Sequence, residues 1–102
     1  MKNLLDNISS HSDSELFETI AESNHTKVER IVSYGQTTPD DQPYHQTHDE
    51  WVMVIKGKSN LKIEHIGEIT LLANDSILIP KNHRHWVTYT SNPTIWLAVH
   101  MH

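Results

Sequence analysis

The sequence predicts an all-β protein that folds as a jelly-roll barrel with one short N-terminal helix. From Lys27 onward the chain consists of short apolar runs rich in Val, Ile, Thr, Trp and Tyr, and turn-forming residues separate these runs at regular intervals, a pattern typical of β-strands. With 102 residues, the chain can build one core and one domain. Several short strands in so small a domain must hide their sheet edges, which a barrel or a two-sheet jelly roll achieves.

The N-terminal part of the chain has a different pattern. Ser12 and Glu15 have the spacing of a capping box, and the apolar residues between Leu16 and Ala21 recur at helical intervals. Together these features predict a short helix over residues 14–23.

The barrel is predicted to span residues 27–102, after an N-terminal segment of residues 1–26, within one structural domain. Turns are expected at Gly35, Gly57 and Pro80. The predicted strands cover residues 28–34, 51–56, 59–65, 68–72, 76–79, 86–90 and 94–101. A small immunoglobulin-type sandwich is the rival architecture, but the Cys and Trp spacing that marks it is absent.

Composition excludes several classes of function. The net charge of −5 argues against a surface that tracks nucleic-acid phosphates. Without cysteine, the chain has no disulfide, thiolate metal site or cysteine nucleophile. No apolar run approaches the length of a membrane helix, and the first residues lack a signal-peptide pattern. We therefore expect a cytoplasmic protein that binds neither nucleic acid nor membrane. The nine histidines are unusual.

Side chains that can bind a metal concentrate in two stretches, residues 44–57 and 74–87. They include His45, His48, Glu50, His83 and His85. Imidazole and carboxylate ligands together suit first-row divalent metals. Two strands of a rigid barrel would hold such ligands in a fixed geometry.

In these stretches the sequence resembles a small single-domain cupin of unassigned function. Glu50 and Gly57 reproduce the E-x6-G spacing that ends the first cupin motif. The first four marked positions of the second motif are occupied by Asn74, Pro80, Asn82 and His85. Asn replaces Gly at two of these positions, and because Asn accepts a positive φ, the turn geometry can be preserved. The resemblance extends over residues 28–102.

The first motif departs from the cupin pattern at its paired histidines. Counting back four residues from Glu50 places Gln46 and Tyr44 at those positions, whereas counting back five places His45 and Pro43 there. Neither spacing supplies two histidines.

The resemblance implies that Glu50 and His85 occupy ligand positions inside the barrel, with a third ligand from His45, His48 or Gln46. A mononuclear divalent ion (Zn, Fe, Mn or Ni) acting on or binding a small organic molecule is the leading interpretation. Cupins include dioxygenases, isomerases, lyases and metal-free binding domains, so the resemblance selects no reaction and leaves enzyme activity open.

The alternative is a metal-free pocket in which Gln46, Glu50, His85 and Tyr89 hydrogen-bond a small ligand. A purely structural barrel is a third possibility, but it gives no reason for inward polar groups. Three further histidines have no assigned role: His83, His100 and His102.

The alternation of side chains in the predicted strand that follows Glu50 indicates that a second subunit covers the barrel. If Glu50 points into the barrel, Val52 and Val54 do so too, while the apolar residues of the opposite parity, from Trp51 to Ile55, point outward. A strand that is apolar on both faces needs cover on the outside. The N-terminal helix or a second subunit would supply it, and we expect a homodimer.

Overall fold

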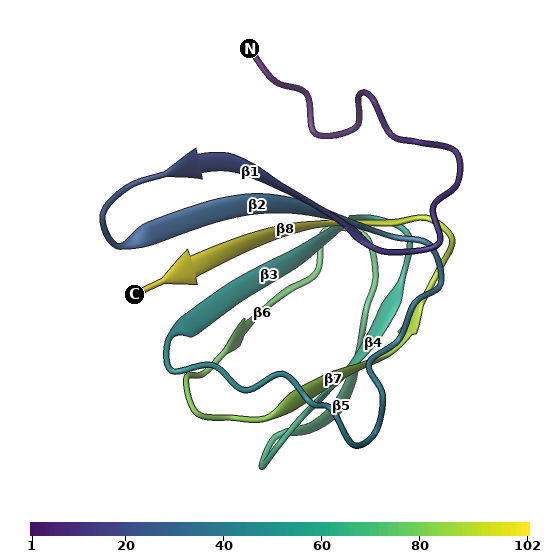
Figure 1. Ribbon diagram of the computed structural model, residues 1–102. Coiled ribbons are helices and arrows are strands. Elements are labelled where there is room, and N and C mark those ends of the chain that lie inside the picture. The colour runs from purple at the N-terminus through teal and green to yellow at the C-terminus, as the bar shows by residue number, and fades with distance from the viewer.

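Eight β-strands form two antiparallel sheets that face one another, and the chain contains no helix (Figure 1). The computed structural model describes residues 1–102. The strands are β1 Leu16–Glu22, β2 Thr26–Ser33, β3 Asp49–Lys56, β4 Ser59–Ile63, β5 Gly67–Leu71, β6 Ser76–Ile79, β7 His85–Thr90 and β8 Thr94–Met101. One sheet has the order β1-β2-β8-β3-β6 and the other β5-β4-β7. The predicted all-β jelly roll is confirmed, and no helix that could span a membrane is present.

All seven predicted strands are present, and β6 and β8 have the predicted bounds. The two asparagines that stand at glycine positions of the cupin motif both adopt the left-handed conformation, with φ of 75° at Asn74 and 64° at Asn82. Asn therefore preserves the turn geometry, as the sequence predicts.

The predicted N-terminal helix is wrong, because residues 16–22 form strand β1. Its backbone pairs with β2, which would otherwise be an unpaired sheet edge. Ser12 makes a local turn with Ser14 instead of capping a helix. Pairing with the sheet thus overrides the local helical pattern, and it turns Phe17 toward the barrel interior.

Strand β8 lies between β2 and β3 and holds the large sheet together. Alternation along these strands sends one set of side chains between the sheets, as the buried Val52 and Val54 of β3 show. The core that they form comprises Val52, Val54, Leu61, Ile63, Leu71, Ile79, Trp96 and Ala98.

The N-terminal segment covers one end of the outer face of the large sheet. Ile8 packs there against a second cluster that includes Val32 and Ile95. The guanidinium of Arg30 donates hydrogen bonds to the backbone carbonyls of Leu4 (3.1 Å) and Asp6 (2.7 Å). The chain therefore covers this end of the outer face with an extended N-terminal segment and not with a helix.

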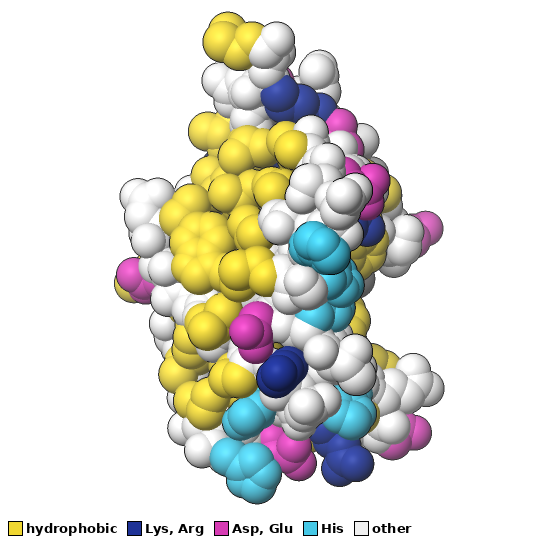
Figure 2. All heavy atoms as spheres, turned by 90° about the vertical axis from the view of Figure 1, so that its left-hand side faces the viewer, with side chains coloured by type: hydrophobic (Ala, Val, Ile, Leu, Met, Phe, Trp, Pro, Cys, Tyr) yellow, Lys and Arg dark blue, Asp and Glu magenta, His cyan; other side chains and the backbone are white.

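The other end of the outer face remains partly uncovered. One cross-strand row there consists of Val28, Val99, Trp51 and Leu78, from β2, β8, β3 and β6. The first three are half-buried, and Leu78 is 46% exposed. Figure 2 shows hydrophobic side chains gathered over part of the surface beside a group of histidines.

Gly57, between β3 and β4, is expected to tolerate no side chain. Its φ is +94°, and an added Cβ would lie 2.7 Å from the carbonyl oxygen of Pro93 as well as against Ser91. Gly67 has a similar φ of +112° but open space around it. We expect Gly57→Ala to lower the free energy of unfolding by about 3 kcal/mol and Gly67→Ala by about 1 kcal/mol. Urea denaturation measures both; equal losses would mean that contacts at Gly57 do not matter.

Candidate ligand-binding pocket

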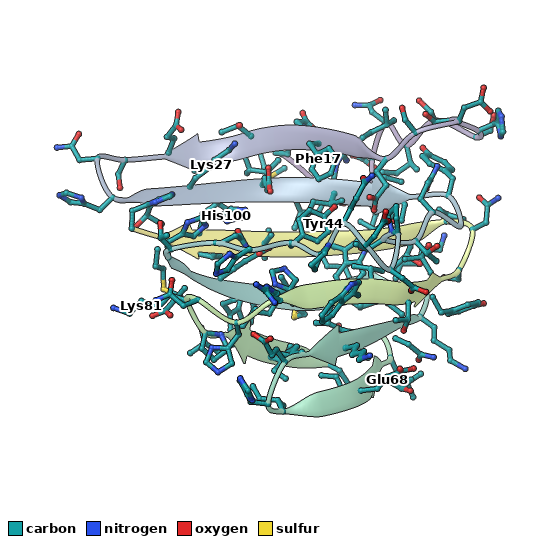
Figure 3. The ribbon with its side chains drawn as sticks, turned by 60° about the horizontal axis from the view of Figure 1, so that its bottom comes forward. Phe17, Lys27, Tyr44, Glu68, Lys81 and His100 are labelled. Atoms are coloured by element: carbon teal, nitrogen blue, oxygen red, sulfur yellow. The ribbon has the colours of Figure 1, made fainter.

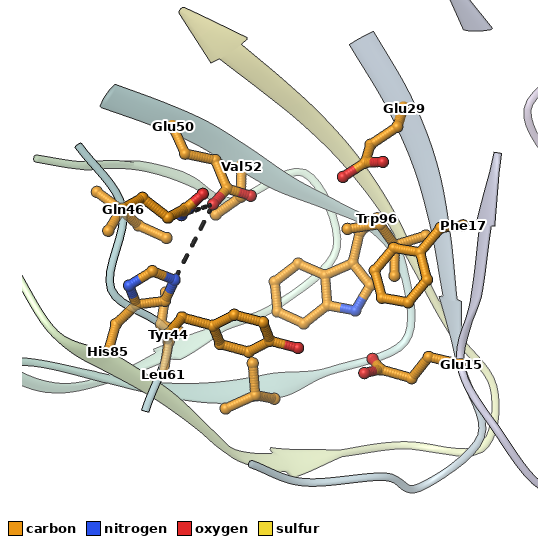
Figure 4. Close-up of a pocket in the computed structure, with 13 residues that line it drawn as sticks. Glu15, Phe17, Glu29, Tyr44, Gln46, Glu50, Val52, Leu61, His85 and Trp96 are labelled. Atoms are coloured by element: carbon orange, nitrogen blue, oxygen red, sulfur yellow. Dashed lines mark hydrogen bonds and ion pairs between the residues drawn. The ribbon is translucent and has the colours of Figure 1, made fainter. Parts of the chain in front are cut away.

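A pocket with a volume of about 100 Å³ opens between the two sheets (Figure 4). Eight of its 13 lining residues are hydrophobic. The complete lining is Glu15, Phe17, Glu29, Ile31, Tyr44, Gln46, Glu50, Val52, Leu61, Ile79, His85, Val87 and Trp96. An apolar cavity with a few converging polar groups is the usual form of a small-molecule site.

One wall of the pocket carries three polar side chains in contact or near contact. Nε2 of Gln46 donates a hydrogen bond of 2.7 Å to Oε1 of Glu50. Nε2 of His85 lies 4.0 Å from the same oxygen. The ring of Tyr44 stacks on that of His85, with centroids 5.2 Å apart. Glu50 and His85 thus face each other inside the barrel, and Gln46 lines the pocket beside them.

The loop before β3 follows the four-residue spacing of the cupin motif. Tyr44 pairs with His85 through two backbone hydrogen bonds of 2.9 and 3.0 Å, so the chain is extended there. Alternation then directs Tyr44 and Gln46 inward and His45 outward, where it is exposed. The paired-histidine positions are therefore occupied by a phenol and an amide, and His45 does not line the pocket.

His48 lies at the rim with other histidines. Its Nε2 is 2.9 Å from Nδ1 of His100, and its ring is 4.1 Å from that of His102, centroid to centroid. His100 in turn reaches Oε1 of Glu29 at 2.8 Å. The structure thus joins His48 to a rim network, outside the pocket lining, and His100 and His102 belong to the same network.

Tyr89 lies outside the pocket and is 45% exposed. The reason is a bulge in β7: Val87 pairs with Leu61, but Tyr89 pairs with the adjacent Asn60, which leaves one extra residue on β7. Such a bulge reverses the inward and outward parity. His83 also stays outside the lining.

The lining residues that the sequence did not indicate include Glu15, Phe17 and Glu29. The first two come from the stretch interpreted as a helix, in which residues two apart would not share a face. In β1 they do, and Figure 3 shows Phe17 on the side of β1 that faces Tyr44. Glu29 lies in a predicted strand between Val28 and Arg30, and no pattern in the sequence marked it as a pocket residue.

The electrostatics of the pocket are dominated by buried carboxyl groups. Burial, assisted by the charge of Glu29 and opposed by that of His100, raises the pKa of Glu50 from 4.5 to about 7. Burial also lowers the pKa of His85. Burial and the charges of the pocket glutamates raise the pKa of Tyr44. A carboxyl group with a pKa near 7 can accept or donate a proton at neutral pH, so the wall can hydrogen-bond a ligand in either state.

The donor set does not fit the predicted metal ion. Glu50 and His85 supply two ligands, whereas protein metal sites commonly use three or more. Gln46 presents its NH₂ group, and His100 is engaged by Glu29. No group of three or more His, Asp or Glu side chains is arranged to hold a metal.

We expect the elevated pKa of Glu50 to make stability depend on pH. The pKa of Glu50 is about 7 in the folded protein and 4.5 in the unfolded chain. Between these two pH values the folded protein therefore binds more protons than the unfolded chain. This contribution to stability is full below pH 4.5 and is lost as pH rises through about 7, on the order of 3 kcal/mol. Relative to the parent, Glu50→Gln should therefore gain stability from pH 5 to pH 8, measured by urea denaturation.

The control is Glu22→Gln, which removes an exposed carboxylate at the end of β1. The gain of Glu50→Gln over the parent between pH 5 and pH 8 should clearly exceed that of Glu22→Gln. A constant difference for Glu50→Gln would show that burial does not raise the pKa of Glu50.

Comparisons with known proteins agree with this architecture. A structure from Ralstonia eutropha JMP134, described as a "putative mannose-6-phosphate isomerase", is 34% identical, with a TM-score of 0.95 over 99% of this chain and 96% of that one. An RmlC-like cupin family protein with a double-stranded β-helix fold from Methanocaldococcus jannaschii is 16% identical (TM-score 0.72; 92% and 85% covered). DMSP lyase from Ruegeria pomeroyi DSS-3 is 15% identical (TM-score 0.75; 88% and 48% covered). No curated protein matches the chain.

The last two similarities concern the fold alone. The family assignment rests on the cupin domain family Cupin 2, which matches residues 30–100. With its eight-stranded jelly roll and an interior pocket at the motif residues, this chain belongs to the cupins.

Proposed function

We propose that this cupin binds a small organic molecule inside its barrel without a metal ion. The observation that carries the proposal is the wall of Gln46, Glu50 and His85, whose polar atoms converge on a pocket that is otherwise mostly apolar. Gln46 occupies a position where a metal-binding cupin would have a histidine ligand, and there it donates a hydrogen bond to Glu50. A cytoplasmic ligand-binding or sensing domain is the function that this arrangement supports best.

The metal-dependent alternative keeps one specific observation in its favour. Glu50 and His85 face each other at 4.0 Å, so an ion held by these two groups and water would place a Lewis acid in the pocket. Its remaining ligands would have to come from rotated side chains.

A phosphorylated sugar of the kind that the Ralstonia protein's description names is a poor match for this pocket. The lining contains three glutamates and neither Lys nor Arg. A phosphate group placed there would meet like charge without a compensating cation.

We expect protein purified without a His tag to contain far less than one metal ion per chain by elemental analysis. In the presence of EDTA, a screen of small metabolites by thermal shift should still yield ligands, and His85→Ala should abolish their effect because it removes one polar group of the wall. His83→Ala is the matched control, because His83 lies two residues away but outside the lining. One metal per chain, lost in His85→Ala and kept in His83→Ala, would establish the metal-dependent function instead.

We further propose that two chains associate through the uncovered end of the large sheet. The chain's own N-terminal segment reaches only the end near Ile8, and it leaves the row from Val28 to Leu78 partly exposed. A two-fold axis would place the same apolar row of each subunit against the other.

Light scattering is therefore expected to give twice the 11.8 kDa chain mass. Leu78→Glu should shift the protein toward the monomer, because it places a charge in the contact. Leu72→Glu is the control, since Leu72 is similarly exposed (53% against 46%) but lies outside this sheet. A monomeric parent protein at micromolar concentration would refute the homodimer.

A further inference from the structure

The pocket described above is lined by carboxylates from three separate elements. Glu15 precedes β1, Glu29 belongs to β2 and Glu50 to β3. Figure 4 shows their side chains directed at the same space from different sides. All three also contribute to the raised pKa of the Tyr44 hydroxyl, so their negative fields overlap within the pocket.

These carboxylates are only partly compensated by the protein. Glu15 accepts a hydrogen bond from Ser33. Glu29 contacts His100 at 2.8 Å and Lys27 at 3.7 Å, and Lys27 is not among the lining residues. Oε1 of Glu50 accepts the amide of Gln46. Buried carboxylates that lack a cation are costly, so a positive charge inside the pocket would relieve their mutual repulsion.

One carboxylate oxygen is available for a ligand. Glu50 is only 7% exposed. Its Oε2 accepts no hydrogen bond, and Nε2 of His100 lies 3.9 Å from it. This oxygen is directed into the pocket and has no partner within hydrogen-bond distance.

Aromatic rings supply the remaining recognition chemistry. Phe17, Tyr44 and Trp96 line the pocket from β1, the loop before β3 and β8, and Figure 4 shows the three rings side by side. Nε1 of Trp96 donates a hydrogen bond of 3.1 Å to Oγ of Ser33, which fixes the indole. Aromatic faces attract cations, and they contact alkyl groups well.

We propose that the ligand of this pocket is a small organic cation, with an alkylated ammonium group held by the three carboxylates and the three aromatic rings. The volume of about 100 Å³ limits the enclosed part of the ligand to a small group, since a cavity of about 150 Å³ holds one benzene molecule. The rest of the ligand would extend through the pocket opening. This inference rests on the proposed function of the pocket as a small-molecule site and names the chemical class of its ligand.

Calorimetric titration with choline and with 3,3-dimethylbutan-1-ol tests the inference. The two molecules have nearly the same shape, but only choline is charged. We expect choline to bind roughly tenfold more tightly than the neutral alcohol. Sodium phosphate and mannose 6-phosphate should not bind, because the lining has no cationic Lys or Arg.

Two variants assign the charge selectivity to this pocket. Glu15→Gln should weaken choline binding several-fold and leave the alcohol unaffected, whereas Glu22→Gln, at an exposed site outside the pocket, should change neither. Phe17→Leu should also weaken choline selectively, and because Phe17 is 57% exposed the variant should fold normally.

The outcomes distinguish failure of the cation inference from failure of the proposed small-molecule pocket. Equal binding of choline and the alcohol, with both lost in His85→Ala, would overturn the cation inference and retain a small-molecule pocket. Binding of phosphates in preference to choline would overturn it in the same way. If neither probe binds and the metabolite screen finds no ligand that depends on His85, both the inference and the proposed function fail.

Discussion

The insertion of β8 between β2 and β3 is the constraint on which the rest of the structure depends. The last strand of the chain pairs along its whole length with β2 and over most of its length with β3. It thereby joins two parts of the sequence that have no direct contact with each other in the sheet. The same strand brings the indole of Trp96 into the pocket and His100 to its rim. The pairing of β8 therefore both completes the large sheet and places residues of the site.

The pocket combines two properties that oppose each other. Its apolar walls favour neutral groups, yet Glu29 and Glu50 are each only 7% exposed. Each of the two carboxyl groups has one close polar contact: His100 for Glu29 and the Gln46 amide for Glu50. Because Glu50 also has a pKa of about 7, its charge changes near neutral pH. Stability and recognition therefore draw on the same carboxyl group.

Sequence reasoning predicted the barrel because the strand periodicity from Lys27 onward is local and unambiguous. Motif spacing and alternation agree for Glu50 and His85, and both residues line the pocket. Sequence reasoning failed where long-range pairing decides the outcome. Residues 16–22 carry a helical pattern that pairing with β2 overrides, and Tyr89 is turned outward by a bulge that no residue type announces. Glu15 and Phe17 were missed for the first of these reasons.

The β1–β2 hairpin and the residue before it supply one wall of the pocket. The segment that matches the cupin family begins at residue 30, whereas Glu15, Phe17 and Glu29 all precede it. One wall of the pocket thus lies outside the segment that matches the family, whereas Tyr44, Glu50 and Trp96 of the same pocket lie within it. Two cupins could share the scaffold of residues 30–100 and differ in specificity through this hairpin alone. An edge strand that contacts only one neighbour is the part of the sheet whose side chains can be exchanged with the least disturbance to the core.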